Sequence, residues 1–203
     1  MRDDGTVDEK VGREKTVNVV EPGSALVAAP WLQDPNFRRT VVLIIDHGTL
    51  GTLGVVLNRP SDVAVRDVLP SWGPHATAPR ALYVGGPLHQ RAALCVAALP
   101  PGVDAERTEG MIKVRGPLAL LDLDADPDLM APHLRGLRVF AGYAGWVQGQ
   151  LGCEMDRGDW LVVPALPDDV LAGPDTDLWG RILRRQGMPL ALLATYPTDP
   201  MLN

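Results

Sequence analysis

Cysteine is scarce in this sequence, and long apolar runs are absent. Cys95 and Cys153 are the only cysteines in 203 residues, and neither lies in a C-x-x-C pair. The sequence therefore predicts no disulfide framework and favours a reducing compartment. Apolar runs such as residues 40–45 are far shorter than the ~20 residues of a membrane-spanning helix. The first residues contain no apolar signal-peptide core, so we expect a cytoplasmic protein.

Residues that carry common catalytic and cofactor chemistry are also sparse. Only three serines occur, none in a G-x-S-x-G motif, and the four histidines show no H-x-x-x-H spacing. A serine hydrolase and a zinc site are therefore not expected. Gly85-Gly86-Pro87 lacks the further glycines or the lysine of nucleotide-binding loops. The sequence accordingly predicts no metal and no cofactor.

A positive net charge is lacking as well. Nineteen Lys and Arg residues against 25 Asp and Glu residues give a net charge of −6, which disfavours binding to nucleic acid or to an anionic membrane through bulk charge. A basic helix is predicted at residues 177–186, but no second helix precedes it across a short turn, as a helix-turn-helix requires. We expect no sequence-specific nucleic-acid binding and no membrane binding.

The chain does contain enough apolar residues for one globular domain. Hydrophobic residues make up 46% of it and charged residues 22%, which is typical of a globular chain of this length. Residues 1–21 carry four basic and six acidic side chains and few large apolar ones, so they are predicted to be a flexible charged tail. Residues 22–203 are predicted to form a single domain.

Strand patterns alternate with short helical patterns after the tail. The β-branched run at residues 40–45 and the apolar run at 53–57 flank a glycine-rich loop and predict a hairpin in the centre of a sheet. Further strands are predicted at residues 24–29, 82–84, 92–99, 111–114, 118–123, 137–141, 160–163 and 190–195, and helices at 63–69, 126–134, 142–155, 168–171 and 177–186. Together these patterns predict an α+β fold with a mixed, largely antiparallel sheet flanked by short helices, and leave room for a small inserted subdomain.

The predicted helix at residues 142–155 contains four glycines, although glycine in a helix costs about 1 kcal/mol relative to alanine. Their spacing of 3, 4 and 3 places Gly142, Gly145, Gly149 and Gly152 on one helical face. The first interpretation is close packing of this face on a neighbouring element. The second is a ligand surface flanked by Gln150 and Glu154.

A second candidate site follows from the predicted hairpin. If its strands are antiparallel, Asn58 and Arg59 lie beside Arg38 and Arg39 at one end of the sheet. Arginine offers two parallel donors, so this cluster suits a phosphate or a carboxylate. The alternative is internal ion pairing with three nearby acids, Asp34, Asp62 and Asp67. His47, at the opposite end of the hairpin, is a weaker candidate for a general base.

Six short motifs follow one another from about residue 23 to the end of the chain. They are Phe37-Arg38-Arg39-Thr40-Val41-Val42, Asp46-His47, Gly54-Val55-Val56-Leu57-Asn58-Arg59-Pro60, Gly85-Gly86-Pro87, Gly142-Tyr143-Ala144-Gly145-Trp146 with Gly149-Gln150-Leu151, and Pro197-x-x-Pro200 with Asn203. Together they resemble the YqgE/AlgH family of bacterial proteins, and the Arg, Ala and Pro usage is similar to that of actinobacterial members. The resemblance implies an α+β fold and a family labelled uncharacterised or transcriptional regulator, without established catalytic residues.

Residues and resemblance together predict a binding or regulatory protein rather than an enzyme. Its partner is expected to be a protein or a small anionic ligand. The surface expected to carry binding comprises Asn58, Arg59, Gly85, Gly86 and Gln150. The alternative is an enzyme that acts on a small anionic ligand, with Arg38, Arg39 and Arg59 as clamps and Glu154 or His47 as the base.

Overall fold

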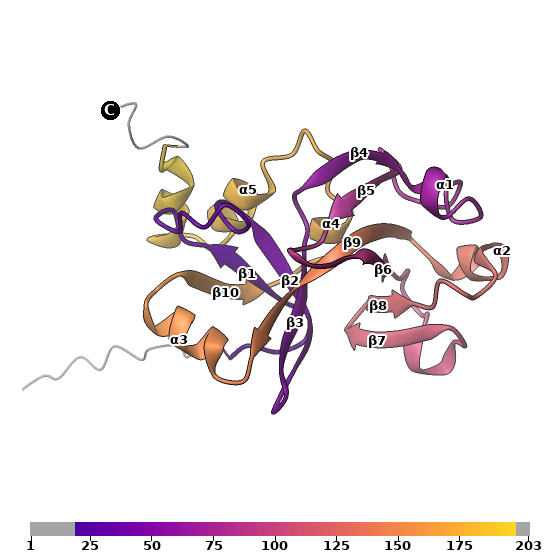
Figure 1. Cartoon of the computed structure of the whole chain (residues 1–203), viewed down its shortest axis with the longest axis horizontal. Coiled ribbons are helices and arrows are strands. Elements are labelled where there is room, and N and C mark those ends of the chain that lie inside the picture. Colours follow the sequence, from indigo (N-terminus) through magenta and orange to yellow (C-terminus); the bar gives the residue numbers. More distant parts are fainter. Residues whose placement is uncertain (1–18, 198–203) are drawn as a thin grey trace, which may run out of the picture.

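The structure, a computed structural model, describes residues 19–197 (Figure 1). Most of the predicted flexible tail, residues 1–18, lies outside this range, as do Pro200 and Asn203 of the last motif. At the near end of the tail, Val20 is buried, and Glu21 forms an ion pair with Arg115. Val20, which was predicted to belong to the tail, therefore packs against the domain.

Ten strands form the sheet in the part of the chain that the structure describes. They are β1 Ser24–Ala28, β2 Val41–Gly48, β3 Gly51–Val56, β4 Pro60–Ala64, β5 Ala81–Val84, β6 Leu88–Ala98, β7 Met111–Arg115, β8 Leu118–Leu121, β9 Gly136–Val147 and β10 Trp160–Pro164. The main order is β10-β1-β2-β3-β9-β6-β8-β7, with β5 beside β9 and β4 beside β5. All of these pairings are antiparallel except that of β5 with β9. The predicted α+β fold with a mixed, largely antiparallel sheet is confirmed.

Short helices flank this sheet. They are α1 Val65–Val68, α2 Pro127–Met130, α3 Gln150–Asp156, α4 Pro167–Val170 and α5 Leu178–Arg185, with 3-10 turns η1 Ala105–Arg107, η2 Ala131–His133 and η3 Leu190–Thr195. Among residues 19–197, no helix is long and apolar enough to cross a membrane. In Figure 1, α3 and α5 lie at one end of the long axis of the molecule, and α1 and α2 lie at the other.

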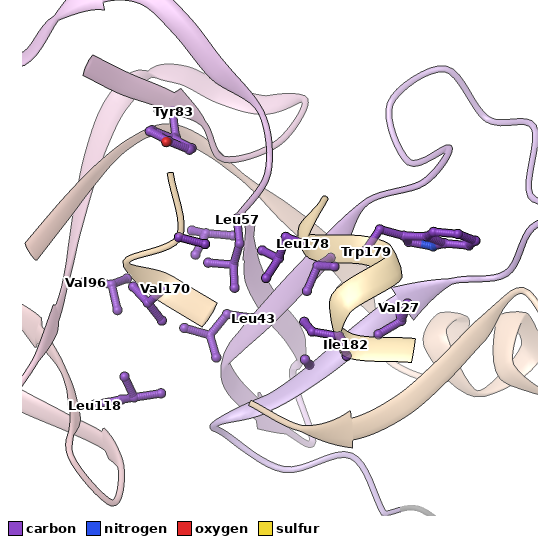
Figure 2. Packing of buried hydrophobic residues seen from close by; sticks show 14 of the residues in the cluster. Val27, Leu43, Leu57, Tyr83, Val96, Leu118, Val170, Leu178, Trp179 and Ile182 are labelled. Carbon is purple, nitrogen blue, oxygen red and sulfur yellow. The ribbon is translucent and has the colours of Figure 1, made fainter. Parts of the chain in front are cut away.

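The largest core cluster joins α5 to the central strands. Trp179 and Ile182 of α5 share this cluster with Val27 of β1 and Leu43 of β2 (Figure 2). The indole Nε1 of Trp179 also donates to the carbonyl oxygen of Ala28 at 2.8 Å. Burial of each such side chain stabilises the fold by about 1.5–3 kcal/mol. The apolar side chains of α5 therefore face the sheet.

Two further clusters occupy the remaining faces of the sheet. Val42 and Ile44 belong to a cluster that also contains Trp146 and Trp160, beside α3. The third cluster contains buried residues of β6, β8 and β9 together with Met130 of α2 and residues that flank α1. Each end of the long axis thus has a hydrophobic cluster of its own.

The predicted central hairpin is formed by β2 and β3. Val42 pairs with Val56 and Leu43 with Val55 in antiparallel register, and a bulge shifts the register between Ile44 and Asp46. All five residues from Val41 to Ile45 are buried. The apolar, β-branched run is therefore covered on both faces, as expected.

The predicted helix at residues 142–155 is wrong over its first half. Residues up to Val147 belong to β9, and only Gln150–Asp156 form a helix. Gly142 has a φ of +70°, and a Cβ there would lie 2.6 Å from the carbonyl oxygen of Leu88. The glycine thus allows a strand crossing. The four glycines do not form one helical face, so neither interpretation of such a face applies.

Two other predicted elements differ from the structure. The segment predicted as a helix at residues 63–69 is the end of strand β4 followed by the single turn α1, which begins after Ala64 without a side-chain cap. The last predicted strand, residues 190–195, is the 3-10 helix η3 beside α5. Both segments are short, and the periodicity of a short segment does not separate strand from helix.

Candidate functional site

The arginine-rich end of the hairpin forms as predicted from antiparallel pairing. The Asn58 side chain accepts from the backbone N–H of Val41 at 3.0 Å and donates to the carbonyl oxygen of Arg39 at 2.9 Å. Nη2 of Arg59 donates to the carbonyl oxygen of Pro35 at 2.9 Å and more weakly to that of Arg38 at 3.5 Å. Asn58 and Arg59 thereby hold the 35–39 turn against the end of the hairpin.

The predicted ion pairs at this end are not formed. In the described chain, Arg38, Arg39 and Arg59 make no salt bridge with an acidic residue, and Asp67 pairs instead with Arg66. Burial lowers the pKa of Arg59, and the nearby carboxylate of Asp34 opposes that shift. The carbonyl oxygens, not carboxylates, are the main partners of Arg59.

Arg39 has a different environment from its neighbours. Its guanidinium carbon lies 4.0 Å from the centroid of the Trp179 ring, and Nη1 donates to the carbonyl oxygen of Tyr196 at 2.9 Å. A cation over an indole face is attracted by the ring quadrupole. Arg39 therefore joins the hairpin to α5 and to the residues after η3 and is committed to internal packing.

Gly85 and Gly86 are buried where the connection between β5 and β6 crosses β9. A Cβ on Gly85 would lie 2.3 Å from the carbonyl oxygen of Gly142, and one on Gly86 would lie 2.2 Å from the carbonyl carbon of Tyr143. No larger residue fits without moving backbone. The role of these glycines in the fold is close approach of two chain segments.

A small hollow lies between the arginine-rich end and this crossing. Its lining consists of Asn36, Val56, Arg59, Val84, Gly86, Pro87 and Gln90, and its volume is about 30 Å³. We call it the Arg59 hollow. One of its polar side chains, Gln90, was not singled out from the sequence. Gln90 gives no local signal, because only the long-range crossing brings it near Arg59.

The carboxylate of Glu154 is held by three side-chain donors. Its Oε2 accepts from the indole Nε1 of Trp146 and from that of Trp160, both at 2.8 Å, and its Oε1 accepts from Gln150 Nε2 at 3.0 Å. The Oε1 of Gln150 in turn accepts from the backbone N–H of Val147 at 3.2 Å. We call these residues the Glu154 network.

An aromatic side chain closes the Glu154 network from the turn. The Phe37 ring lies 5.9 Å from the Trp146 ring and 5.5 Å from the Trp160 ring, centroid to centroid. Phe37 is the chain neighbour of Arg38. Among residues 19–197, however, no hydrogen bond or ion pair joins Glu154 to an arginine of the turn. The predicted surface therefore consists of two groups, with Gln150 and Glu154 in a separate network.

His47 lies at the far end of β2 from the arginines. It is exposed, and its Nδ1 lies 2.7 Å from the hydroxyl of Thr52, directly across the hairpin. The arginines proposed as clamps and His47 as a base thus stand at opposite ends of one strand. The two do not face a common ligand.

A buried arginine was not singled out from the sequence. Arg138 is 1% exposed and donates to the carbonyl oxygens of Val170, Leu171 and Ala172, and its guanidinium carbon lies 4.1 Å from the Tyr83 ring centroid. Burial lowers the pKa of Arg138. Its contacts fasten the segment after α4 to β9, which is a structural role.

The chain is similar to known proteins over most of its length. The AlgH-like family model (DUF179) matches residues 25–191. A UPF0301 protein of Rhodococcus opacus is 53% identical over 184 residues, which cover 91% of this chain and 92% of the relative. One of Mycolicibacterium smegmatis is 50% identical over the same coverage.

Two solved structures resemble the fold. A crystal structure of a protein from Corynebacterium diphtheriae has a TM-score of 0.86 and 47% identity, and covers 88% of this chain and 93% of that one. The solution structure of the AlgH protein from Pseudomonas aeruginosa has a TM-score of 0.62 and 29% identity, and covers 86% and 93%. The likeness thus extends over nearly the whole described domain.

Proposed function

Because this chain belongs to the AlgH-like family, for which the resemblance implies no established catalytic residues, we propose that it acts by binding a protein partner, in a regulatory role. The contact surface is the Arg59 hollow, whose lining includes the exposed residues Asn36 and Gln90. The observation that supports the proposal is the small volume of this hollow, about 30 Å³.

A volume of about 30 Å³ accommodates one water-sized group. Enclosed sites for small molecules are about 300–1,000 Å³. The Arg59 hollow therefore suits a single oxygen atom presented by a larger surface, such as one carboxylate oxygen of a protein side chain. Arg59 supplies the charge and the amides of Asn36 and Gln90 supply further donors.

The environments of the two candidate bases favour binding over catalysis at this surface. Both oxygens of Glu154 already accept hydrogen bonds: Oε2 accepts from two tryptophan indoles and Oε1 from Gln150. His47 lies at the far end of β2 from Arg59. Proton transfer requires a base within hydrogen-bond reach of the reacting group, and neither side chain meets this condition beside Arg59.

A regulatory role would operate through a protein rather than through direct contact with DNA. The basic side chains of α5 are engaged with acids: Arg181 and Arg185 with Asp169, and Arg184 with Asp177. Neutralised arginines contribute little to phosphate binding. This supports the expectation that the chain does not bind duplex nucleic acid specifically.

The test compares two exposed glutamines changed in the same way. Gln90→Glu places a carboxylate beside Arg59, whereas Gln148→Glu makes the same charge change after β9, near α3. Each protein is purified from its native host, and co-purifying proteins are quantified by mass spectrometry. We expect Gln90→Glu to retain at least one partner about tenfold less than wild type, equivalent to ~1.4 kcal/mol, while Gln148→Glu retains it fully.

Two outcomes would contradict the proposal. One is an identical set of proteins on all three baits. The other is a small anionic compound that native mass spectrometry finds on wild type and not on Gln90→Glu, which would favour the enzyme alternative.

A further inference from the structure

A second surface lies around α2, at the end of the long axis that also carries α1 (Figure 1). Two hollows of about 640 and 570 Å³ share Gly110, Asp122 and Asp124 in their linings. Leu129 lines the first hollow and Ile112 the second, and we call the two hollows together the α2 groove. It extends from α2 past the end of β8 to the first residues of β7.

Apolar side chains line the α2 groove and remain open to solvent. Leu129 of α2 is 72% exposed and Ile112 of β7 is 68% exposed. Leu94, Leu120 and Leu123 add partly buried apolar surface to the lining. Exposed apolar side chains gathered in a groove are typical of an interaction site, because burial by a partner removes that surface from water.

Acidic side chains surround this apolar surface. Glu109, Asp122, Asp124 and Asp126 line the groove, against the basic residues Arg107 and His133. None of the four carboxylates forms an ion pair within the part of the chain described. Asp122 and Asp126 each use one oxygen to accept from a backbone N–H, at 3.0 and 2.9 Å. The negative charge of the groove is therefore largely uncompensated.

We propose that the α2 groove binds a basic, amphipathic segment of a protein partner, with an apolar side chain on Leu129 and Lys or Arg side chains at Asp122 and Asp124. This rests on the proposed function, since it adds a second contact to the same class of partner. Apolar burial supplies affinity, and the opposite charges steer association and fix the register of the segment.

The arrangement of the acids fits a peptide better than a metal ion. Within residues 19–197, no three His, Cys, Asp or Glu side chains converge closely enough to hold a metal. The carboxylates instead follow the groove, with Asp122 and Asp124 common to both hollows.

The test uses three synthetic heptapeptides and NMR spectra of the isotope-labelled full chain. The first alternates leucine with lysine, the second replaces lysine by glutamate, and the third replaces leucine by serine. We expect the first to shift the amides of residues lining the α2 groove, with an affinity that falls as salt is raised. The glutamate and serine peptides are each expected to bind at least tenfold more weakly.

Matched variants locate the charge effect. Glu109→Gln with Asp124→Asn removes two groove carboxylates that accept no hydrogen bond in the described chain, and Asp156→Asn with Asp175→Asn removes two exposed carboxylates outside the groove lining. We expect the first pair to weaken the leucine-lysine peptide about tenfold and the second to leave its affinity unchanged. Equal weakening by both pairs would overturn the proposal.

Three other results would also overturn it: no shift with the leucine-lysine peptide, shifts that lie mainly outside the groove, or the same amides shifting with Ca²⁺ alone at micromolar concentration. The Arg59 hollow is tested independently, because Gln90→Glu leaves the groove intact. Peptide failure alongside partner loss in Gln90→Glu refutes the groove alone. Peptide binding alongside full partner retention by Gln90→Glu refutes the Arg59 contact alone.

Discussion

The Glu154 network and the α2 groove lie at opposite ends of the molecule (Figure 1). Both place carboxylates beside apolar side chains, but within the described residues only the carboxylate of the network has side-chain partners. In the network, one carboxylate accepts from two indoles and an amide and is covered by aromatic rings. In the groove, four carboxylates lie beside exposed leucine and isoleucine side chains and form no ion pair within the described residues. Acids whose bonds are completed internally stabilise the fold, whereas acids left open are available to a partner.

The largest expected difference in the free energy of unfolding is between truncation of an apolar side chain of the network and truncation of one in the groove. Trp146 is 4% exposed and contacts two other aromatic rings, so Trp146→Ala is expected to lower the free energy of unfolding by about 3–5 kcal/mol. Leu129→Ala, at a side chain 72% exposed, is expected to change it by less than ~0.5 kcal/mol. Urea denaturation of both variants measures the difference, and similar losses would contradict the comparison.

The next largest difference in stability is expected between substitutions of Glu154 in the network and of Asp124 in the groove. Glu154→Ala leaves the indole N–H groups of Trp146 and Trp160 without their acceptor, at an expected cost of about 1–3 kcal/mol. Asp124→Asn removes a charge that bonds to no described group and is expected to cost less than ~0.5 kcal/mol. Thermal unfolding of the two proteins at neutral pH tests this. If Asp124→Asn were the more damaging change, the groove acids would be structural.

Two glycines beside Glu154 provide a finer test. A Cβ at either Gly149 or Gly152 meets nothing within 4 Å, but Gly149 has a φ of +79°. Gly149→Leu is therefore expected to destabilise by about 1–2 kcal/mol through backbone strain alone. Gly152→Leu, within α3, is expected to be neutral or stabilising by up to ~1 kcal/mol. Equal destabilisation by both variants would instead support the interpretation that the glycines pack closely on a neighbouring element.

Most of the hairpin region was predictable, because its signals are local. The β-branched run at residues 40–45, the glycine loop and antiparallel pairing together placed Arg38 and Asn58 at one end of the sheet. The turn carbonyls that bind Arg59 gave no signal, so carboxylate partners were expected in their place. A backbone acceptor has no signature in a sequence.

The region around β9 was not predictable from local pattern. Gly142 and Gly86 satisfy contacts between segments more than 50 residues apart, and helical spacing of the glycines there is incidental. Glu154 was singled out as a candidate site residue, but its indole partners were not, because Trp146 lies on β9 and Trp160 on β10. Long-range packing overrides local propensity at such positions.

The smallest effect compares the two cysteines, one in each region. Cys153 is exposed beside Glu154, whereas Cys95 is 1% exposed in the wall of the α2 groove, and burial raises the pKa of its thiol. A thiol that stays protonated and buried reacts slowly. We expect one fast-reacting thiol in the native protein at pH 8 and two after denaturation. Rapid labelling of both in the native state would show that β6 is open at the groove.

The most direct test asks whether Glu154 serves the fold or a ligand. Glu154→Gln keeps an oxygen acceptor for both indoles, and it is purified from the native host beside wild type and Gln90→Glu. The account predicts that Glu154→Gln retains the same partners in the same amounts as wild type, while Gln90→Glu loses at least one. A folded Glu154→Gln protein that loses its partners, with Gln90→Glu unaffected, would contradict it.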